Sequence, residues 1–176
     1  MNTKFSKLAL AIGALVMAGG AWAATDGSTM EVTASVAAAC SVGNGGTMAL
    51  GAITMLSADG TQTTTDTTAA TATFPAICTT GTTAPTFTYV STNALTGAFR
   101  LIGSTTATDF ITYTLYPSTD GSGTVIASGT AVAYTGFVID GTSKNLALSA
   151  RIAPGAKTGQ SVQNYTDTIA ITVTFS

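Results

Sequence analysis

The final stretch of the chain, residues 168–176, is Thr-Ile-Ala-Ile-Thr-Val-Thr-Phe-Ser. Apolar side chains alternate here with small or hydroxylated ones, which is typical of a β-strand with one buried face. The buried face would hold Ile169, Ile171, Val173 and Phe175. We therefore expect a strand over Thr168–Phe175 that runs to the end of the sequence. Its next neighbour in the sheet would have to come from elsewhere.

The same alternation recurs along the chain and predicts many short strands. The clearest of the others are Met30–Ala38, Ala69–Ala76, Thr86–Ser91, Phe110–Tyr116, Val132–Ile139 and Leu146–Ile152, with shorter candidates at Met48–Ile53, Phe99–Ile102 and Thr124–Ala127. Turn-forming residues separate them, as in Gly43-Asn44-Gly45-Gly46, Asp120-Gly121-Ser122-Gly123 and Asp140-Gly141. The 37 threonines among 176 residues agree, because β-branched side chains favour strands. Together these features predict an all-β sandwich or barrel.

The composition excludes several classes of function. The chain has no histidine, which removes serine–histidine catalysis and histidine-ligated metal sites. Only 8% of its residues are charged and the net charge is −2, which argues against a nucleic-acid partner. The eight acidic residues are spread along the chain, and several lie beside glycine as turn residues do. We therefore predict no enzyme activity, no cofactor and no metal.

The N-terminus has the features of an export signal. Lys4 and Lys7 precede an apolar stretch from Leu8 to Gly19, and Ala21-Trp22-Ala23 supplies a cleavage site. Twelve apolar residues are too few for a membrane span, which needs about 20. An uncleaved anchor is the alternative. We expect a signal peptide over residues 1–23 and an exported product.

The two cysteines, Cys40 and Cys78, both lie in the exported part. In an oxidising compartment, such a pair most simply forms a disulfide. Two free buried thiols are the alternative.

The segment Met30–Ala38 admits two interpretations. Its apolar face holds Met30, Val32, Ala34, Val36 and Ala38, and Glu31, Thr33 and Ser35 lie on the other. Because the segment precedes Cys40, it lies outside the loop that the disulfide would close. It is either an edge strand of its own sandwich or a strand meant for another molecule, and the pattern alone favours the edge strand.

A family resemblance bears on this choice. The relevant segments are, in order, Ala39-Cys40-Ser41-Val42, Ala49-Leu50-Gly51, Ile77-Cys78-Thr79, Tyr113-Thr114-Leu115-Tyr116, Ser149-Ala150-Arg151-Ile152, Tyr165-Thr166-Asp167-Thr168 and the terminal strand. In this order, behind a signal peptide, they resemble the spore-coat-U-like pilin domain of archaic (Csu and CupE type) chaperone–usher pili. Leu50 departs from the pattern, since the family tends to have an aromatic residue there.

The resemblance implies an incomplete immunoglobulin-like β-sandwich that a donor strand from a neighbouring subunit completes. Residues 24–38 would be the donor extension and residues 39–176 the pilin domain. The donor strand would insert Met30, Val32, Ala34, Val36 and Ala38 beside a groove edge formed by Ile169, Ile171, Val173 and Phe175. With the resemblance, the donor-strand interpretation becomes the favoured one.

The resemblance also implies the partners and the role. Identical subunits would form a homopolymeric shaft, a thin surface fibre (fimbrium) for adhesion and biofilm formation. A periplasmic chaperone would hold each subunit, with contacts near Phe175 and the carboxylate of Ser176, until an outer-membrane usher assembles it. The rival hypothesis is a free-standing secreted carbohydrate-binding β-sandwich whose own edge strand is Met30–Ala38.

Overall fold

The computed structural model describes residues 29–54, 69–157 and 160–176. The predicted signal peptide and most of the threonine run after Gly60 lie outside these residues. The chain divides into two units, residues 1–35 and 36–176, and the helix and strands of the described residues all belong to the second. In the first unit, residues 29–35 lie in no strand and are exposed.

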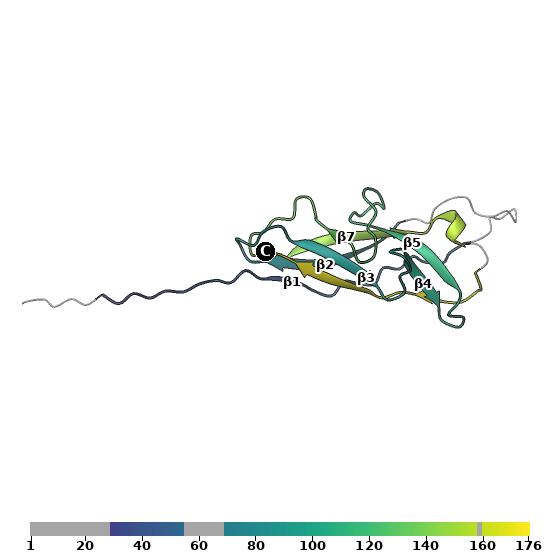
Figure 1. The fold of residues 1–176 in the computed structure, drawn as a ribbon. Coiled ribbons are helices and arrows are strands. Elements are labelled where there is room, and N and C mark those ends of the chain that lie inside the picture. Colours follow the sequence, from purple (N-terminus) through teal and green to yellow (C-terminus); the bar gives the residue numbers. More distant parts are fainter. Residues whose placement is uncertain (1–28, 55–68, 158–159) are drawn as a thin grey trace, which may run out of the picture. The chain divides into compact units, whose positions relative to one another are not determined.

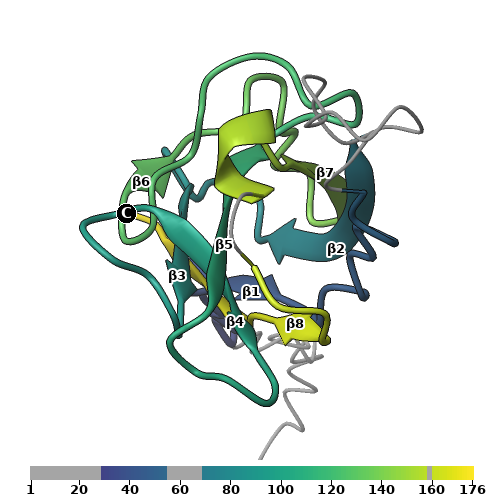
Figure 2. The same ribbon diagram turned by 90° about the vertical axis from the view of Figure 1, so that its right-hand side faces the viewer.

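The second unit is built from two antiparallel sheets (Figure 1). The six-stranded sheet has the order β1 (Cys40–Val42), β2 (Ala70–Cys78), β7 (Lys144–Arg151), β5 (Phe110–Tyr116), β4 (Phe99–Gly103) and β8 (Tyr165–Thr166). The three-stranded sheet has the order β6 (Ala131–Val132), β3 (Thr86–Ser91) and β9 (Ile169–Thr174). Figure 2 shows β3 and β6 on one side of the domain and β2 and β7 on the other. One short helix, η1 (Pro154–Lys157), follows β7. The predicted all-β, immunoglobulin-like sandwich is confirmed.

Aromatic side chains from both sheets fill the core between them. Phe74 of β2 and Phe87 of β3 pack edge to face, with ring centroids 5.9 Å apart. Phe87 also packs against Tyr134 and Phe137, at 5.4 and 5.6 Å. The buried hydroxyl of Tyr89 lies 2.6 Å from that of Tyr134, so it keeps a hydrogen bond inside the core.

Most of the predicted strands are present. Thr86–Ser91 and Phe110–Tyr116 have the predicted bounds, and four others differ only at their ends: Ala69–Ala76, Phe99–Ile102, Leu146–Ile152 and Thr168–Phe175. The sequence did not indicate the short strands β1 and β8.

Three predictions were wrong as strands, and Met30–Ala38 is unpaired in this single chain. Of Val132–Ile139, only Val132 lies in a strand, because the backbone turns where Phe137 N donates to Tyr134 O and Gly136 has a φ of 79°. The segments Met48–Ile53 and Met30–Ala38 lie in no strand, and in Thr124–Ala127 only Ile126 forms a bridge, with Leu115. In the part of the chain that the structure describes, no helix is long and apolar enough to cross a membrane.

Candidate functional site: the groove beside β9

The disulfide predicted from the two cysteines is confirmed. Cys40 and Cys78 lie opposite each other in β1 and β2 and are bonded. Directly before Cys40, the backbone of Ala39 is bound to Thr79, whose N donates to Ala39 O and whose Oγ1 accepts from Ala39 N, both at 2.9 Å. These bonds fix the point at which the N-terminal segment leaves the domain.

One edge of β9 is open. On its other side β9 pairs with β3, and among the described strands none pairs with the open edge. Thr92 N donates to Thr168 O at 3.0 Å, and antiparallel bonds recur at every second residue. The bonds to β3 therefore fall at even-numbered residues. The backbone N–H and C=O groups of Ile169, Ile171 and Val173 consequently face the open edge.

A groove runs between β9 and the segment of residues 42–50. Its first part has a volume of about 580 Å³, with Ile169 and Ile171 on one wall. Phe74, Leu148 and Ala150 line the same cavity from β2 and β7. A second part of about 1120 Å³ lies between residues 47–54 and residues 161–167. The two parts share Met48, Leu50 and Leu101, so we treat them as one groove.

Beyond Val42 of β1, the wall opposite β9 is formed without a strand. Met48, Leu50 and Ile53 are half-buried and pack against the core, whereas Ala49 and Ala52 are exposed. The alternation that predicted a strand over Met48–Ile53 therefore holds for Met48 and Leu50 and is lost after Gly51, and no strand pairing accompanies it.

Asp167 is the acidic residue that lines both parts of the groove, and its oxygens are already occupied. Tyr113 OH donates to Oδ2 at 2.7 Å, and Asn93 Nδ2 and Thr168 N donate to Oδ1 at 3.2 and 2.8 Å. Burial, followed by the hydrogen bond to Asp167, raises the pKa of Tyr113 above its ordinary value. The network joins the start of β9 to β5. Because the oxygens of Asp167 are occupied, the side chains that a ligand would contact in the groove are mainly apolar.

The four residues predicted for the groove edge differ in their placement. Ile169, Ile171 and Val173 are half-buried on the inward face of β9, and the first two line the groove. Phe175 lies beyond the strand and is 37% exposed. After it, Ser176 exchanges backbone hydrogen bonds with Thr83, at 2.8 and 3.3 Å.

The residues predicted for the donor strand are exposed. Met30, Val32 and Val36 are 87, 85 and 86% exposed, and Ala34 and Ala38 are exposed as well. Large apolar side chains with this exposure, in an alternating order, are suited to burial by another molecule.

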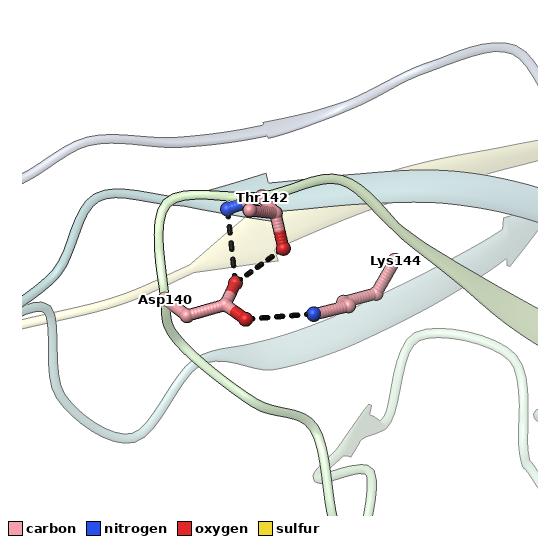
Figure 3. A network of polar contacts seen from close by, with 3 residues as sticks. All are labelled: Asp140, Thr142 and Lys144. Carbon is pink, nitrogen blue, oxygen red and sulfur yellow. Dashed lines mark hydrogen bonds and ion pairs between the residues drawn. The ribbon is translucent and has the colours of Figure 1, made fainter.

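Asp120 and Asp140, the two described aspartates beside glycine, behave as turn residues. Asp140 Oδ1 accepts from Thr142 N at 2.9 Å, and Lys144 Nζ donates to Asp140 Oδ2 at 2.7 Å (Figure 3). Lys144 and then Thr142 hold the pKa of Asp140 well below its usual value. Asp120 Oδ1 accepts from Ser122 N in the same way. Within the described residues, no three His, Cys, Asp or Glu side chains gather as a metal site.

Three residues of this region have roles that the sequence alone did not predict. Asp167 and Thr79 belong to segments quoted for the family resemblance, but no role followed from their types alone. Gly45 was noted only as part of a turn, and its position in the groove wall follows from the packing of β2 and β9.

The fold and this site define a class: an immunoglobulin-like domain with an open strand edge above an apolar groove. The Spore Coat Protein U domain family matches residues 26–172, and the chain belongs to this family. The resemblance to spore-coat-U-like pilins is thereby confirmed, and the family is a structural one rather than one of enzymes.

Other comparisons add little. The chain is similar to a chain in the structure described as "Chaperone-tip adhesin complex is vital for synergistic activation of CFA/I fimbriae biogenesis", with 16% identity and a TM-score of 0.41. The match covers 61% of this chain and 35% of that chain, about a third of its length. No curated protein matches the chain.

Proposed function

We propose that this chain is a pilin of a chaperone–usher pilus and that it polymerises by donor-strand complementation. Residues 30–38 of one copy would fill the groove beside β9 of the next. Strand addition to an open edge is a known mode of recognition, of which pilins are an example. The observation that carries the proposal is an apolar groove below unpaired backbone groups, in a chain that leaves an alternating apolar segment out of its own sheets.

Burial of the donor side chains would favour insertion of the segment into the groove. Met30, Val32 and Val36 would each contribute about 1.5–3 kcal/mol and each alanine about 0.8 kcal/mol. Ordering of the segment costs about 1–2 kcal/mol per residue, and backbone pairing with β9 and the opposite wall offsets part of it. Because the three large side chains are solvent-exposed in the free segment, nearly their whole apolar area is available for burial.

The donor register follows from the alternation on both strands. In an antiparallel pair, residues opposite each other point to the same face. Five inward donor residues (30, 32, 34, 36 and 38) can face five inward positions of the acceptor (175, 173, 171, 169 and 167). This register places Ala34 opposite Ile171. A slip by one residue would turn Glu31 into the groove, at a large cost in free energy.

The other features of the chain agree with this role. Residues 1–23 would direct export, residues 24–38 would form the donor extension and residues 39–176 the pilin domain. Identical subunits, a periplasmic chaperone and an outer-membrane usher would be the partners. The product would be a fimbrial shaft at the cell surface that serves adhesion and biofilm formation.

The carbohydrate-binding alternative has less support. It required residues 30–38 as the edge strand of the same sandwich, and they lie in no strand of the structure. No observation at the groove favours a sugar, because Asp167, the one acidic residue among the described residues that line it, already accepts hydrogen bonds from its neighbours.

The test is assembly of the mature chain with one charge placed on either face of the donor strand. Val32→Asp puts a carboxylate into the groove, so we expect it to block fibre formation, as seen by electron microscopy and size-exclusion chromatography. Thr33→Asp puts the same charge on the outer face and should assemble as the unmodified chain does. Equal assembly of the two variants would refute the proposed register.

A further inference from the structure

Three glycines, Gly43, Gly45 and Gly46, lie close together in the groove wall opposite β9. They differ in the space that a side chain would find at each position. A Cβ at Gly43 would lie 2.6 Å from Pro75 Cγ, so a side chain there collides with β2. A Cβ at Gly46 would meet nothing within 4 Å. Neither Gly45 nor Gly46 has a positive φ, so the backbone does not require glycine at either position.

Gly45 is distinguished by the direction of its missing side chain. A Cβ there would lie 3.7 Å from Phe74 Cβ and 3.9 Å from Ile171 Cδ1, which are ordinary van der Waals distances. Phe74 and Ile171 both line the groove, so a side chain at residue 45 would enter it without straining the subunit. The groove is narrow at this level, because the side chain of Ile171 reaches toward the opposite wall.

We propose that Gly45 is a specificity-determining position of the groove. Resting on the proposed function, this inference assigns the space beside Gly45 and Ile171 to one small side chain of a second copy, Ala34 in the register above. The large donor residues Val32 and Val36 lie on either side of it. The fit is therefore a match between a narrow point of the groove and a small residue of the donor strand, which fixes the register more sharply than alternation alone.

Filling this space from either side should have the same effect. Gly45→Leu would occupy it from the wall with an apolar side chain that contacts Phe74 and Ile171. Ala34→Leu in the donor would overfill it against the same residues, because closely packed apolar sites do not accept added methyl and methylene groups freely.

The experiment uses the full mature chain carrying Val32→Asp, which cannot donate and so presents an empty groove. Binding of a synthetic peptide of residues 25–39 is measured by fluorescence anisotropy. We expect Gly45→Leu to weaken binding of the peptide at least about tenfold. The control is Gly155→Leu in η1, outside the residues that line the groove, where a Cβ would meet nothing within 4 Å and the affinity should not change. The peptide with Ala34→Leu should bind at least about tenfold more weakly to the Val32→Asp chain, and a peptide with Ser35→Leu should bind normally.

Thermal melts of the same chains provide a second readout. Gly45→Leu should raise the Tm of the peptide-free chain by about 2–4 °C relative to Gly155→Leu, because the side chain at residue 45 fills an empty apolar space. The comparison cancels the loss of backbone freedom that both substitutions cause in the unfolded state.

The outcomes separate this inference from the proposed function. The first outcome is that the Val32→Asp chain binds the unmodified peptide, and that neither Gly45→Leu in the chain nor Ala34→Leu in the peptide lowers the affinity. The inference about Gly45 is then overturned and the proposed function stands. If the Val32→Asp chain binds no peptide, the proposed function fails and the inference fails with it. Should Gly45→Leu not fold, the Ala34→Leu peptide still decides, because it leaves the acceptor unchanged.

Discussion

The hydroxyls of Tyr89 and Tyr134 depend on each other for a hydrogen bond in the core. Tyr134 OH donates to Ala147 O at 3.3 Å and lies 2.6 Å from Tyr89 OH, so Tyr89 donates to Tyr134. Tyr134→Phe would leave the fully buried Tyr89 hydroxyl without a partner and should reduce the free energy of unfolding by about 1–3 kcal/mol. Urea denaturation measures this loss. Tyr116→Phe, whose hydroxyl has no hydrogen-bond partner among the described residues, is the control.

The same pair predicts a loss of stability at high pH. Burial raises the pKa of Tyr134 to about 12 and also raises that of Tyr89 above its ordinary value. Because the folded state holds these protons more tightly, their contribution is complete below the unfolded pKa of about 10. This contribution to stability is lost as the pH rises from about 10 through the pKa values that the two tyrosines have in the folded state. A chain with both tyrosines changed to Phe should lose less unfolding free energy between neutral pH and about pH 11, and an equal loss would contradict this assignment.

At the scale of single elements, the disulfide stabilises the pairing of β1 with β2, because β1 is too short to form many backbone hydrogen bonds. β1 has three residues, and Cys40 is linked to Cys78 across a separation of 38 residues. Chain-entropy arguments assign a loop of this size about 4 kcal/mol of stability. The Cys40→Ser, Cys78→Ser double variant should lose unfolding free energy of that order, as measured by urea denaturation. A much smaller loss would mean that β1 and the groove wall after it persist without the link.

The contact between β4 and β8 depends on Gly103. A Cβ at Gly103 would collide with the side chain of Gln163, whose Oε1 accepts from Thr105 N and Thr106 N at 2.7 and 3.0 Å. Gly103→Ala should therefore cost about 1–3 kcal/mol of unfolding free energy, whereas Gly46→Ala should be nearly neutral. Removing the obstacle with Gln163→Ala in the same chain should recover part of the loss. Strictly additive losses would show that the two residues do not interact.

The elements also show what the sequence can and cannot predict. Strict alternation located Thr86–Ser91 and Phe110–Tyr116 to the residue, because both strands lie within a sheet with one buried face. It failed at Val132–Ile139, where Tyr134 and Phe137 are core residues delivered by a turn rather than by a strand. β1 and β8 were missed because two or three residues carry no period.

The groove was expected through the family resemblance, and the alternation of β9 alone did not predict it. An open edge is the absence of a neighbour, and no residue of β9 records that absence. The sequence could place Ile169, Ile171 and Val173 on one face, but the opposite wall at Gly45 depends on how residues 42–50 lie across Phe74. The role of Gly45 follows only from the distances between a Cβ at this position and the side chains of Phe74 and Ile171.

At the scale of the whole domain, the two ends of the described fold meet at one pole. The turn of residues 79–83 binds Ala39 through Thr79 and Ser176 through Thr83. The N-terminal segment thus leaves the domain where β9 and its groove end. A donor that enters antiparallel to β9 would place its own domain at the opposite pole, which gives an open head-to-tail chain. A parallel donor would bring two such poles together and permit closed reciprocal pairs.

This geometry predicts how a chain that cannot donate affects assembly. A Val32→Asp subunit still has an empty groove, so in an open chain it can serve only as the first subunit and starts one fibre. When the variant is mixed with the unmodified chain, the mean fibre length should be inversely proportional to the fraction of the variant, as measured by electron microscopy. The total assembled mass should change little. Gly45→Leu added to the same subunit should abolish the shortening, because that subunit can then neither donate nor accept. Assembly that stops at dimers without the variant would instead show parallel insertion and closed pairs.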